Sequence, residues 1–532
     1  MTGDSSPVDA EPVPSRAPVY ARNMVATSQP LAAQAGLAML AAGGNAVDAA
    51  LATAMALTVV EPTGCGLGSD AFAIVWDGTR LHGLNASGRA PAAWTPDRFA
   101  GLERMPERGW DSVTVPGAIG GWIALWRRFG SLPLTTIAGP AIGYARDGYP
   151  VSPSIAFRWQ HEAGILAGQP GFDAFLIEGR APRPGELFRL PALAESLAAI
   201  AASEGEAFYR GALAERMVAH ARAHGGAITE ADFAAETPDW VETLSVDFAG
   251  AAIHEIPPNG QGISALIALG IAERAGIGRY GVDAVETVHV AIESTKLAMA
   301  DAAEYVADPR HLRLDPADLL DPAYLAGRAG LIDRTRAGDP GHGTPRPGGT
   351  VYLAAADAAG MMVSLIQSNY MGFGSGVVVP GTGISLQNRG VGFTLTPGRA
   401  NTVGPGKRPL HTIIPGFAMD ATGAPLMAFG VMGGPMQPQG HLQLAIRTLL
   451  YGQDPQVAID APRWRVVTGR TVAVEADFDP GLVKALGAMG HDIVVDPPDS
   501  VFAFGGAQIV MRSAAGYVGG SDGRKDGQAV GF

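Results

Sequence analysis

The segment 350–390 constrains the fold most, because it contains two apolar runs of strand length in quick succession. TVYLAAAD and MMVSLIQSN are separated only by Ala358, Ala359 and Gly360, which predicts two adjacent strands joined by a tight turn. Small apolar residues occupy odd and even positions alike, so both faces of the sheet are expected to be covered. This pattern predicts stacked sheets enclosed between layers of helices.

The rest of the chain divides into a helical part and a strand-rich part. Residues 115–330 are mostly of helical periodicity, and 284–308 is the longest amphipathic run. Residues 331–349 have linker composition, rich in Pro, Gly and charge, and short strands dominate after them, with helices near 437–452 and 480–489. We therefore expect an α/β (α+β) fold in which both parts contribute to the layers.

Composition excludes several classes of partner. The formal net charge of -13 argues against nucleic acid, whose binding relies on Lys and Arg at the phosphates. The stretch 31–60 is apolar but interrupted by Gly, Asn and Asp, which argues against a membrane span. Residues 1–22 lack the features of a secretory signal and are expected to be a disordered lead-in. We expect a cytoplasmic protein that binds a small molecule, with neither nucleic acid nor membrane as a partner.

Several motifs fail on inspection. GCGLGSD does not have the GxGxxG spacing of a dinucleotide site, and no GxSxG nucleophile elbow is present. His220 and His224 have the spacing of a zinc pair on a helix, but without HExxH an exposed helical face is favoured. Cys65, the only cysteine, is expected to be a small packed thiol. No metal and no organic cofactor is called for.

Thr350 is the candidate nucleophile. A threonine hydroxyl needs a neighbouring base, and cleavage of the Gly349–Thr350 bond would supply one as a free α-amine, with a pKa of about 7.7–8.0. Gly349 leaves room for the hydroxyl to reach its own carbonyl, and the linker can be cut without unfolding the core. The alternative is that Thr350 simply begins a strand after a glycine loop, and the local sequence alone favours that alternative.

Five segments in order resemble the γ-glutamyltransferase family of N-terminal-nucleophile hydrolases. They are LAAGGNAVDAALATAMALTVVEPTGCGLGSDAF, NASGRAP, the block from Thr350 to Gly390, GKRPLHTIIP and GVMGGPMQPQGH, and the similarity spans roughly residues 20–532. The resemblance implies a four-layer αββα sandwich and self-cleavage before the catalytic threonine. We expect a large subunit, 23–349, and a small subunit, 350–532, which form one intertwined unit, with a dimer of such pairs left open as an alternative to a single pair.

The resemblance also implies roles for individual residues. Thr350 matches the nucleophile, and Ser368 matches a hydroxyl residue that hydrogen-bonds to it. Gly433 and Gly434 match the pair whose backbone N–H groups stabilise the oxyanion, a role that requires close backbone approach. Arg89 matches the arginine that binds the substrate's α-carboxylate.

Two segments depart from the family pattern. SLQNRGVGF contains Asn388 and Arg389 but no carboxylate, where the family has an aspartate that binds the substrate's α-ammonium. His411 and Thr412 replace a pair of serines. These four residues are candidate substrate contacts. Because a buried ammonium without a partner is costly, the departures indicate an acyl group that bears a carboxylate but no α-amino group.

The sequence therefore predicts a self-processing amidohydrolase. Its expected substrate is a small carboxylate-bearing amide, such as oxamate or another dicarboxylic monoamide, cleaved through an acyl-threonine intermediate. Three alternatives stay open: a true γ-glutamyltransferase or glutathione hydrolase, a glutaryl-cephalosporin acylase, and an unprocessed relative that only binds a ligand.

Overall fold

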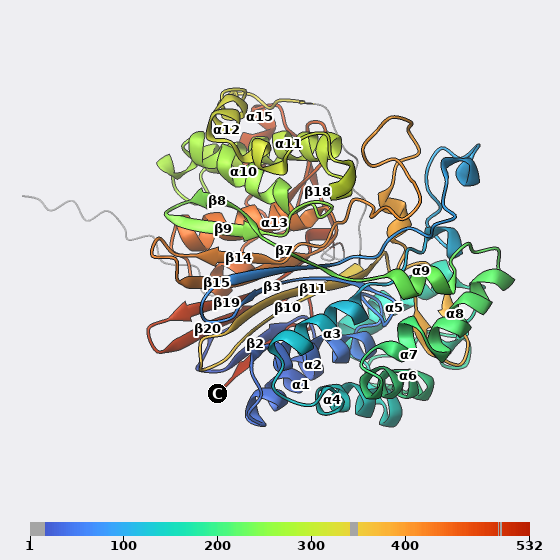
Figure 1. Ribbon diagram of the computed structural model, residues 1–532. Helices are drawn as coiled ribbons and strands as arrows, with labels where there is room; N and C mark the ends of the chain where they lie inside the picture. The colour runs from blue at the N-terminus through green and yellow to red at the C-terminus, as the bar shows by residue number, and fades with distance from the viewer. Residues whose placement is uncertain (1–15, 341–348, 498–499, 501–502) are drawn as a thin grey trace, which may run out of the picture.

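Two seven-stranded antiparallel sheets lie face to face at the centre of the computed structural model, which describes residues 16–340, 349–497, 500 and 503–532 (Figure 1). The first sheet has the order β21 (Gln528–Gly531), β2 (Met24–Thr27), β10 (Gly349–Ala356), β11 (Met362–Tyr370), β3 (Asp70–Trp76), β4 (Leu81–Ala86), β7 (Asp239–Val241). The second has the order β1 (Val19–Ala21), β20 (Gly516–Ser521), β19 (Gly506–Ser513), β15 (Pro425–Met432), β14 (Gly416–Met419), β9 (Ala251–Glu255), β8 (Leu244–Phe248).

Helices cover the outer face of each sheet (Figure 1). The first sheet carries α1 (Pro30–Ala41), α2 (Ala46–Val60), α3 (Ala118–Phe129) and α4 (Leu134–Asp147), with α5 (Pro153–Leu166), α6 (Pro191–Ala202), α7 (Glu206–Tyr209), α8 (Ala212–Ala223) and α9 (Glu230–Ala235) beyond them. The second carries α10 (Gly262–Arg274), α11 (Val285–Tyr305), α12 (Pro322–Ala329), α13 (Met436–Ala445) and α14 (Pro455–Asp460). The expected four-layer αββα sandwich is confirmed.

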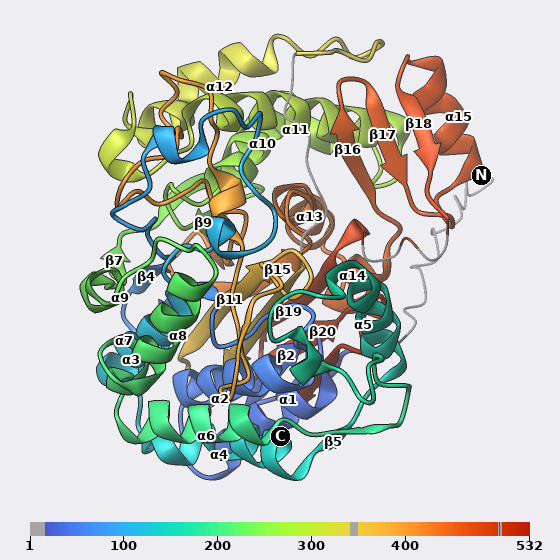
Figure 2. The same ribbon diagram turned by 90° about the vertical axis from the view of Figure 1, so that its right-hand side faces the viewer.

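A smaller sheet lies at one end of the second helical layer (Figure 2). It consists of β16 (Trp464–Thr468), β17 (Thr471–Val474) and β18 (Asp492–Val495), packed against α15 (Pro480–Ala488). No helix in the described part of the chain is both long enough and apolar enough to cross a membrane.

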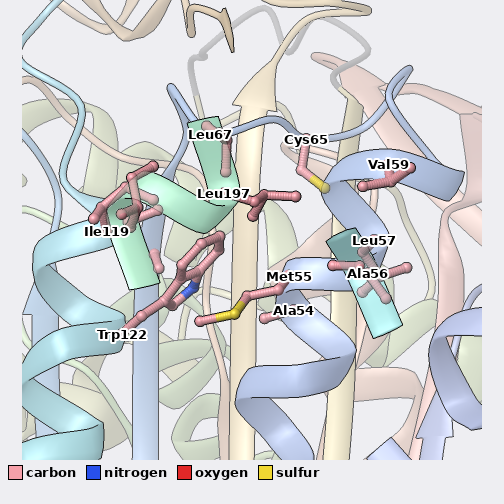
Figure 3. Close-up of a cluster of buried hydrophobic side chains, with 14 of the residues drawn as sticks. Ala54, Met55, Ala56, Leu57, Val59, Cys65, Leu67, Ile119, Trp122 and Leu197 are labelled. Carbon is pink, nitrogen blue, oxygen red and sulfur yellow. The ribbon is translucent and has the colours of Figure 1, made fainter. Parts of the chain in front are cut away.

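The layers pack closely because small residues lie where elements meet. All fifteen residues of the Ala-rich α2 are buried, and Figure 3 shows its side chains meeting Trp122 of α3 beside the first sheet. Between the sheets, a side chain at Gly430 would place its Cβ 2.4 Å from the ring of Tyr352, so this crossing of β15 over β10 requires glycine. β10 and β11 are thus covered on both faces, as their composition predicts.

Short sequence features explain where several elements begin or turn. Asn45, in the GGN segment, caps α2 through a reciprocal pair of hydrogen bonds with Asp48. β3 and β4 form a hairpin that turns at Asp77 and Gly78, a pair of residue types common in such turns. The long helix predicted over 284–308 is α11.

One boundary differs from expectation. The lead-in predicted to be disordered over 1–22 contains β1, whose backbone pairs antiparallel with β20 from Val19 to Ala21. Its three residues give almost no apolar pattern, and the edge of the second sheet supplies the pairing that the local sequence does not reveal. Residues 1–15 and the part of the expected linker from 341 to 348 lie outside the described residues.

Candidate active site

Thr350 lies in a buried bulge at the start of β10. Between the pairs Gly349–Tyr370 and Val351–Gln367, one residue of β10 faces two residues of β11, so the strands are locally out of register. Thr350 is 1% exposed, and its Oγ1 donates a hydrogen bond of 3.1 Å to Ser368 Oγ. The same Ser368 oxygen accepts from the backbone N–H of Tyr370 at 2.7 Å. The predicted nucleophile and its predicted hydroxyl partner are therefore in contact.

The GCGLGSD segment packs against this strand start. A side chain at Gly64 would place its Cβ 2.9 Å from Val351 Cγ1, and the carbonyl of Gly64 accepts from Asn369 N at 3.1 Å. Cys65 is fully buried, and burial together with nearby Glu61 raises the pKa of its thiol well above the usual value. Cys65 is a packed thiol, as expected, and the loop supports the nucleophile.

Arg389 lies beside Tyr370, the residue of β11 that pairs with Gly349 at the expected cleavage site. Its guanidinium carbon is 4.8 Å from the centroid of the Tyr370 ring, and Tyr370 pairs with Gly349 across the two strands. Nη1 donates to Thr412 Oγ1 at 2.7 Å. Burial lowers the pKa of Arg389 to about 10, against the opposing attraction of Asp70, so the guanidinium stays charged at neutral pH. The structure thus groups Arg389 and Thr412 with Thr350 and Ser368.

His411 contacts a carboxylate that the sequence analysis did not single out. Asp70, which pairs with Ser368 across β3 and β11, accepts from His411 Nε2 at 3.1 Å and from the N–H groups of Gly88 and Gly117 at 3.1 and 3.0 Å. Burial lowers the pKa of His411 to about 4, so its ring is neutral near pH 7 and donates to Asp70. In the sequence, the feature that could have identified Asp70 is a carboxylate at the first position of an otherwise apolar strand.

The side chain of Asn388 links two loops of the site through hydrogen bonds to their backbones. Its Oδ1 accepts from Met371 N at 3.2 Å, and its Nδ2 donates to the carbonyl of Glu107 at 2.8 Å. Both ends of the amide are therefore bound to backbone, which fixes the loop after β11 beside the loop that carries Arg389. A direct contact of Asn388 with substrate stays a prediction.

Arg89 lies among carboxylates of the protein. Its Nη2 lies 3.3 Å from Asp239 and its Nη1 3.8 Å from Asp308, while its backbone N–H donates to Glu236 at 3.1 Å. Arg408 joins the same ionic cluster through Asp239. Because carboxylates of the protein already face the Arg89 guanidinium, it is not presented as an open site for a substrate carboxylate.

Gly433 and Gly434 form the turn between β15 and α13. Their φ angles are 126° and 60°, in the region that favours glycine. The carbonyl of Gly433 accepts from Met436 N at 3.2 Å, and that of Gly434 accepts from Gln261 Nε2 at 2.9 Å. Gln261 Nε2 also donates to the carbonyl of Thr412 at 2.6 Å, so one side chain links the glycine turn to the segment beside Arg389. Gln261 is not among the site residues predicted from the sequence.

Metal-ligand spacing does not identify a metal site here. His220 is half-buried on α8 and accepts a hydrogen bond from Trp110 Nε1 at 3.2 Å, while His224 is exposed.

Among the described residues, His289, Glu293 and His491 have ligand atoms close enough to hold an ion. Lys296 occupies that cluster, with Nζ 2.8 Å from Glu293, and His289 and His491 are 2.8 Å apart. A hydrogen-bonded network fits this group better than a cation does.

Comparison with known proteins identifies the family. The sequence matches the family model described as gamma-glutamyltranspeptidase over residues 32–532. The chain belongs to the γ-glutamyltranspeptidase family. As a member of this family it is an enzyme of the hydrolase or acyltransferase type, and the expectation of that activity class is confirmed.

Relatives within the γ-glutamyltranspeptidase family carry several activities. The chain is 38% identical to an oxamate amidohydrolase proenzyme of Klebsiella pneumoniae, over 97% of this chain and 99% of the relative. A crystal structure of a cephalosporin acylase from Bacillus halodurans is 48% identical, with a TM-score of 0.93, covering 100% of this chain and 99% of the acylase. A glutathione hydrolase proenzyme of Escherichia coli is 29% identical over 95% and 91% of the two chains.

Proposed function

We propose that this chain is a self-processing amidohydrolase that cleaves the amide bond of a small carboxylate-bearing substrate, such as oxamate or another dicarboxylic monoamide. The observation that carries the proposal is the buried contact between Thr350 Oγ1 and Ser368 Oγ at the start of β10. Thr350 is the second residue of β10, so a single cut of the Gly349–Thr350 bond makes it an N-terminal residue. The proenzyme relatives support such processing.

Processing begins with the Thr350 hydroxyl, which attacks the carbonyl carbon of Gly349. The C–N bond to Thr350 breaks as the new C–O bond forms, so the acyl group moves from nitrogen to oxygen and the amine gains a proton. Water then hydrolyses the ester, which releases the carboxylate of Gly349 and restores the Thr350 hydroxyl. The product carries nucleophile and base on one residue.

Turnover uses the same hydroxyl. The Thr350 amine accepts its proton as the oxygen attacks the substrate carbonyl, and the N–H groups of Gly433 and Gly434 stabilise the oxyanion. The proton passes to the departing amine, which leaves an acyl-threonine ester. Water completes hydrolysis, whereas a second amine would complete acyl transfer.

The charges around the nucleophile support an acyl group without an α-amine. The oxygens of Asp70 accept hydrogen bonds from Gly88, Gly117 and His411, so this carboxylate is already engaged. Arg389, on whose charge Asp70 acts, adds a buried positive charge that would repel a substrate ammonium. The similarity to the oxamate amidohydrolase agrees with this class.

A second candidate is an acylase that removes a longer acyl group, such as glutaryl, from a cephalosporin-type amine. The 48% identity and the TM-score of 0.93 to the Bacillus halodurans cephalosporin acylase favour it. The two candidates share the chemistry at Thr350 and differ in the length of the acyl group.

Three chromogenic anilides separate the candidates: 4-nitrooxanilate, glutaryl 4-nitroanilide and γ-glutamyl 4-nitroanilide. The last two differ only in the α-amino group, so they form a matched pair. We expect the oxanilate to react fastest, and the glutaryl anilide at least about tenfold faster than its γ-glutamyl counterpart. Faster release from the glutaryl anilide than from the oxanilate would favour the acylase. Preference for the γ-glutamyl anilide, or no turnover by a processed enzyme, would contradict the proposal.

A further inference from the structure

Arg389 is a buried cation with two open nitrogens. It is 2% exposed, and its Nε and Nη2 have no hydrogen-bond partner among the described residues. A buried polar group that lacks a partner costs free energy, and a charged one costs more. This arrangement points to a ligand that completes the hydrogen bonds of Arg389.

The identity of the open nitrogens indicates which ligand. Nε and Nη2 project their N–H groups from one edge of the planar guanidinium, and this edge matches the two oxygens of a carboxylate. Nη1, on the opposite side, is engaged with Thr412 Oγ1 at 2.7 Å. The contact of the guanidinium with the Tyr370 ring further fixes its orientation, so the open edge is held in place rather than free to rotate.

Tyr370 connects this edge to the reaction centre. Its φ of 77° is unusual for a residue with a side chain. In that conformation its ring lies against Arg389, while its N–H donates to the Ser368 oxygen that contacts Thr350. Tyr370 therefore contacts both the guanidinium of Arg389 and the hydroxyl pair of Ser368 and Thr350.

We propose that Arg389, and not Arg89, binds the carboxylate of the substrate's acyl group and thereby selects anionic substrates over γ-glutamyl ones. The inference rests on the proposed amidohydrolase function and names its recognition residue. Arg89 faces Asp239 and Asp308, whereas Asp70, the carboxylate whose charge acts on Arg389, has its oxygens committed to other donors.

Binding of malonate tests the proposal without turnover, because this small dicarboxylate has no amide bond to cleave. Isothermal titration calorimetry compares the wild-type protein with Arg389→Gln, Arg389→Lys and the rival Arg89→Gln. We expect Arg389→Gln to weaken malonate binding about 10- to 100-fold and Arg389→Lys to have an intermediate effect, since lysine keeps the charge but not the two-pronged edge. Arg89→Gln should stay within about threefold of wild type.

The outcomes separate the two proposals. Malonate affinity that is unchanged in Arg389→Gln, that falls as far in Arg89→Gln, or that is absent in wild type overturns the role of Arg389. If Arg389→Gln does not fold, Arg389→Lys decides, and wild-type affinity in that variant overturns the role. An uncut, inactive chain that binds malonate through Arg389 would contradict the amidohydrolase function and leave only the carboxylate-binding role of Arg389 standing.

Discussion

At the scale of single residues, His411 is a neutral histidine enclosed by protein. Its Nε2 donates to Asp70, its Nδ1 accepts from Ile413 N at 3.3 Å, and burial lowers its pKa from 6.5 to about 4. The unfolded chain binds a proton on this ring near pH 6.5, while the folded protein resists protonation until the pH is much lower. The stability contributed by neutral His411 is therefore present above pH 6.5 and is lost as the pH falls toward 4.

His411→Gln should flatten this pH dependence. Between pH 7.5 and 5, the protonation of His411 in the unfolded chain should lower the wild-type free energy of unfolding by about 2 kcal/mol, because a tenfold difference in proton affinity between the two states corresponds to about 1.4 kcal/mol. Urea-unfolding midpoints at both pH values provide the measurement. The wild-type midpoint should fall further than that of the variant, and equal falls in both would show that His411 is not the group responsible.

The sequence predicts which residues belong to the site better than it predicts which contacts they make. The sequence singles out Thr350 and Ser368, and their side chains are in contact. Arg89 and Arg389 are indistinguishable as residue types, and only the surrounding carboxylates tell which guanidinium is occupied. Asp70 and Tyr370 escape prediction because pairing across β3, β10 and β11 brings them to the site, and such pairing is set by tertiary structure.

At the scale of elements, the start of α10 joins two parts of the site. Gln261 precedes this helix, and its side-chain amide bridges the carbonyls of Thr412 and Gly434. Its backbone N–H also donates to the carbonyl of His411 at 2.9 Å. The long elements are predictable from apolar periodicity, as α11 and β10 show, whereas this loop-to-loop bridge leaves no periodic signal.

Gln261→Ala should lower kcat more than it raises KM. Loss of the two hydrogen bonds leaves the carbonyl of Gly434 with only the bond from Gln437 N at 3.1 Å and unlinks the glycine turn from Thr412, so the oxyanion donors are held less firmly in the transition state. We expect kcat to fall about 10- to 100-fold, with partial recovery in Gln261→Asn, which keeps the amide on a shorter side chain. A change confined to KM would contradict this positioning role.

At the scale of the whole molecule, the proposed cleavage position lies within a single packed unit. This position falls between the first two residues of β10, which is paired with β2 of the expected large-subunit segment on one side and β11 on the other. Strands that are apolar on both faces predict the order of the layers. They do not predict which strands belong to which sheet, because each sheet combines strands that are distant in sequence.

Cleavage should therefore leave the two chains associated. We expect the processed protein to elute as one species from a size-exclusion column in native buffer, with both chains in the same fractions, and to separate only in denaturant. The buried interface between the sheets opposes dissociation. Separate elution of the two chains without denaturant would contradict the single-unit architecture.

The most direct test of the account is N-terminal sequencing of the smaller band from a denaturing gel of the purified protein, with Thr350→Ala as the control. The wild type should give a chain of 532 − 349 = 183 residues that begins Thr-Val-Tyr-Leu, and the variant should give one uncut chain. A wild-type protein that stays intact after long incubation, or a variant that is cut and active, would contradict the role of Thr350 as nucleophile.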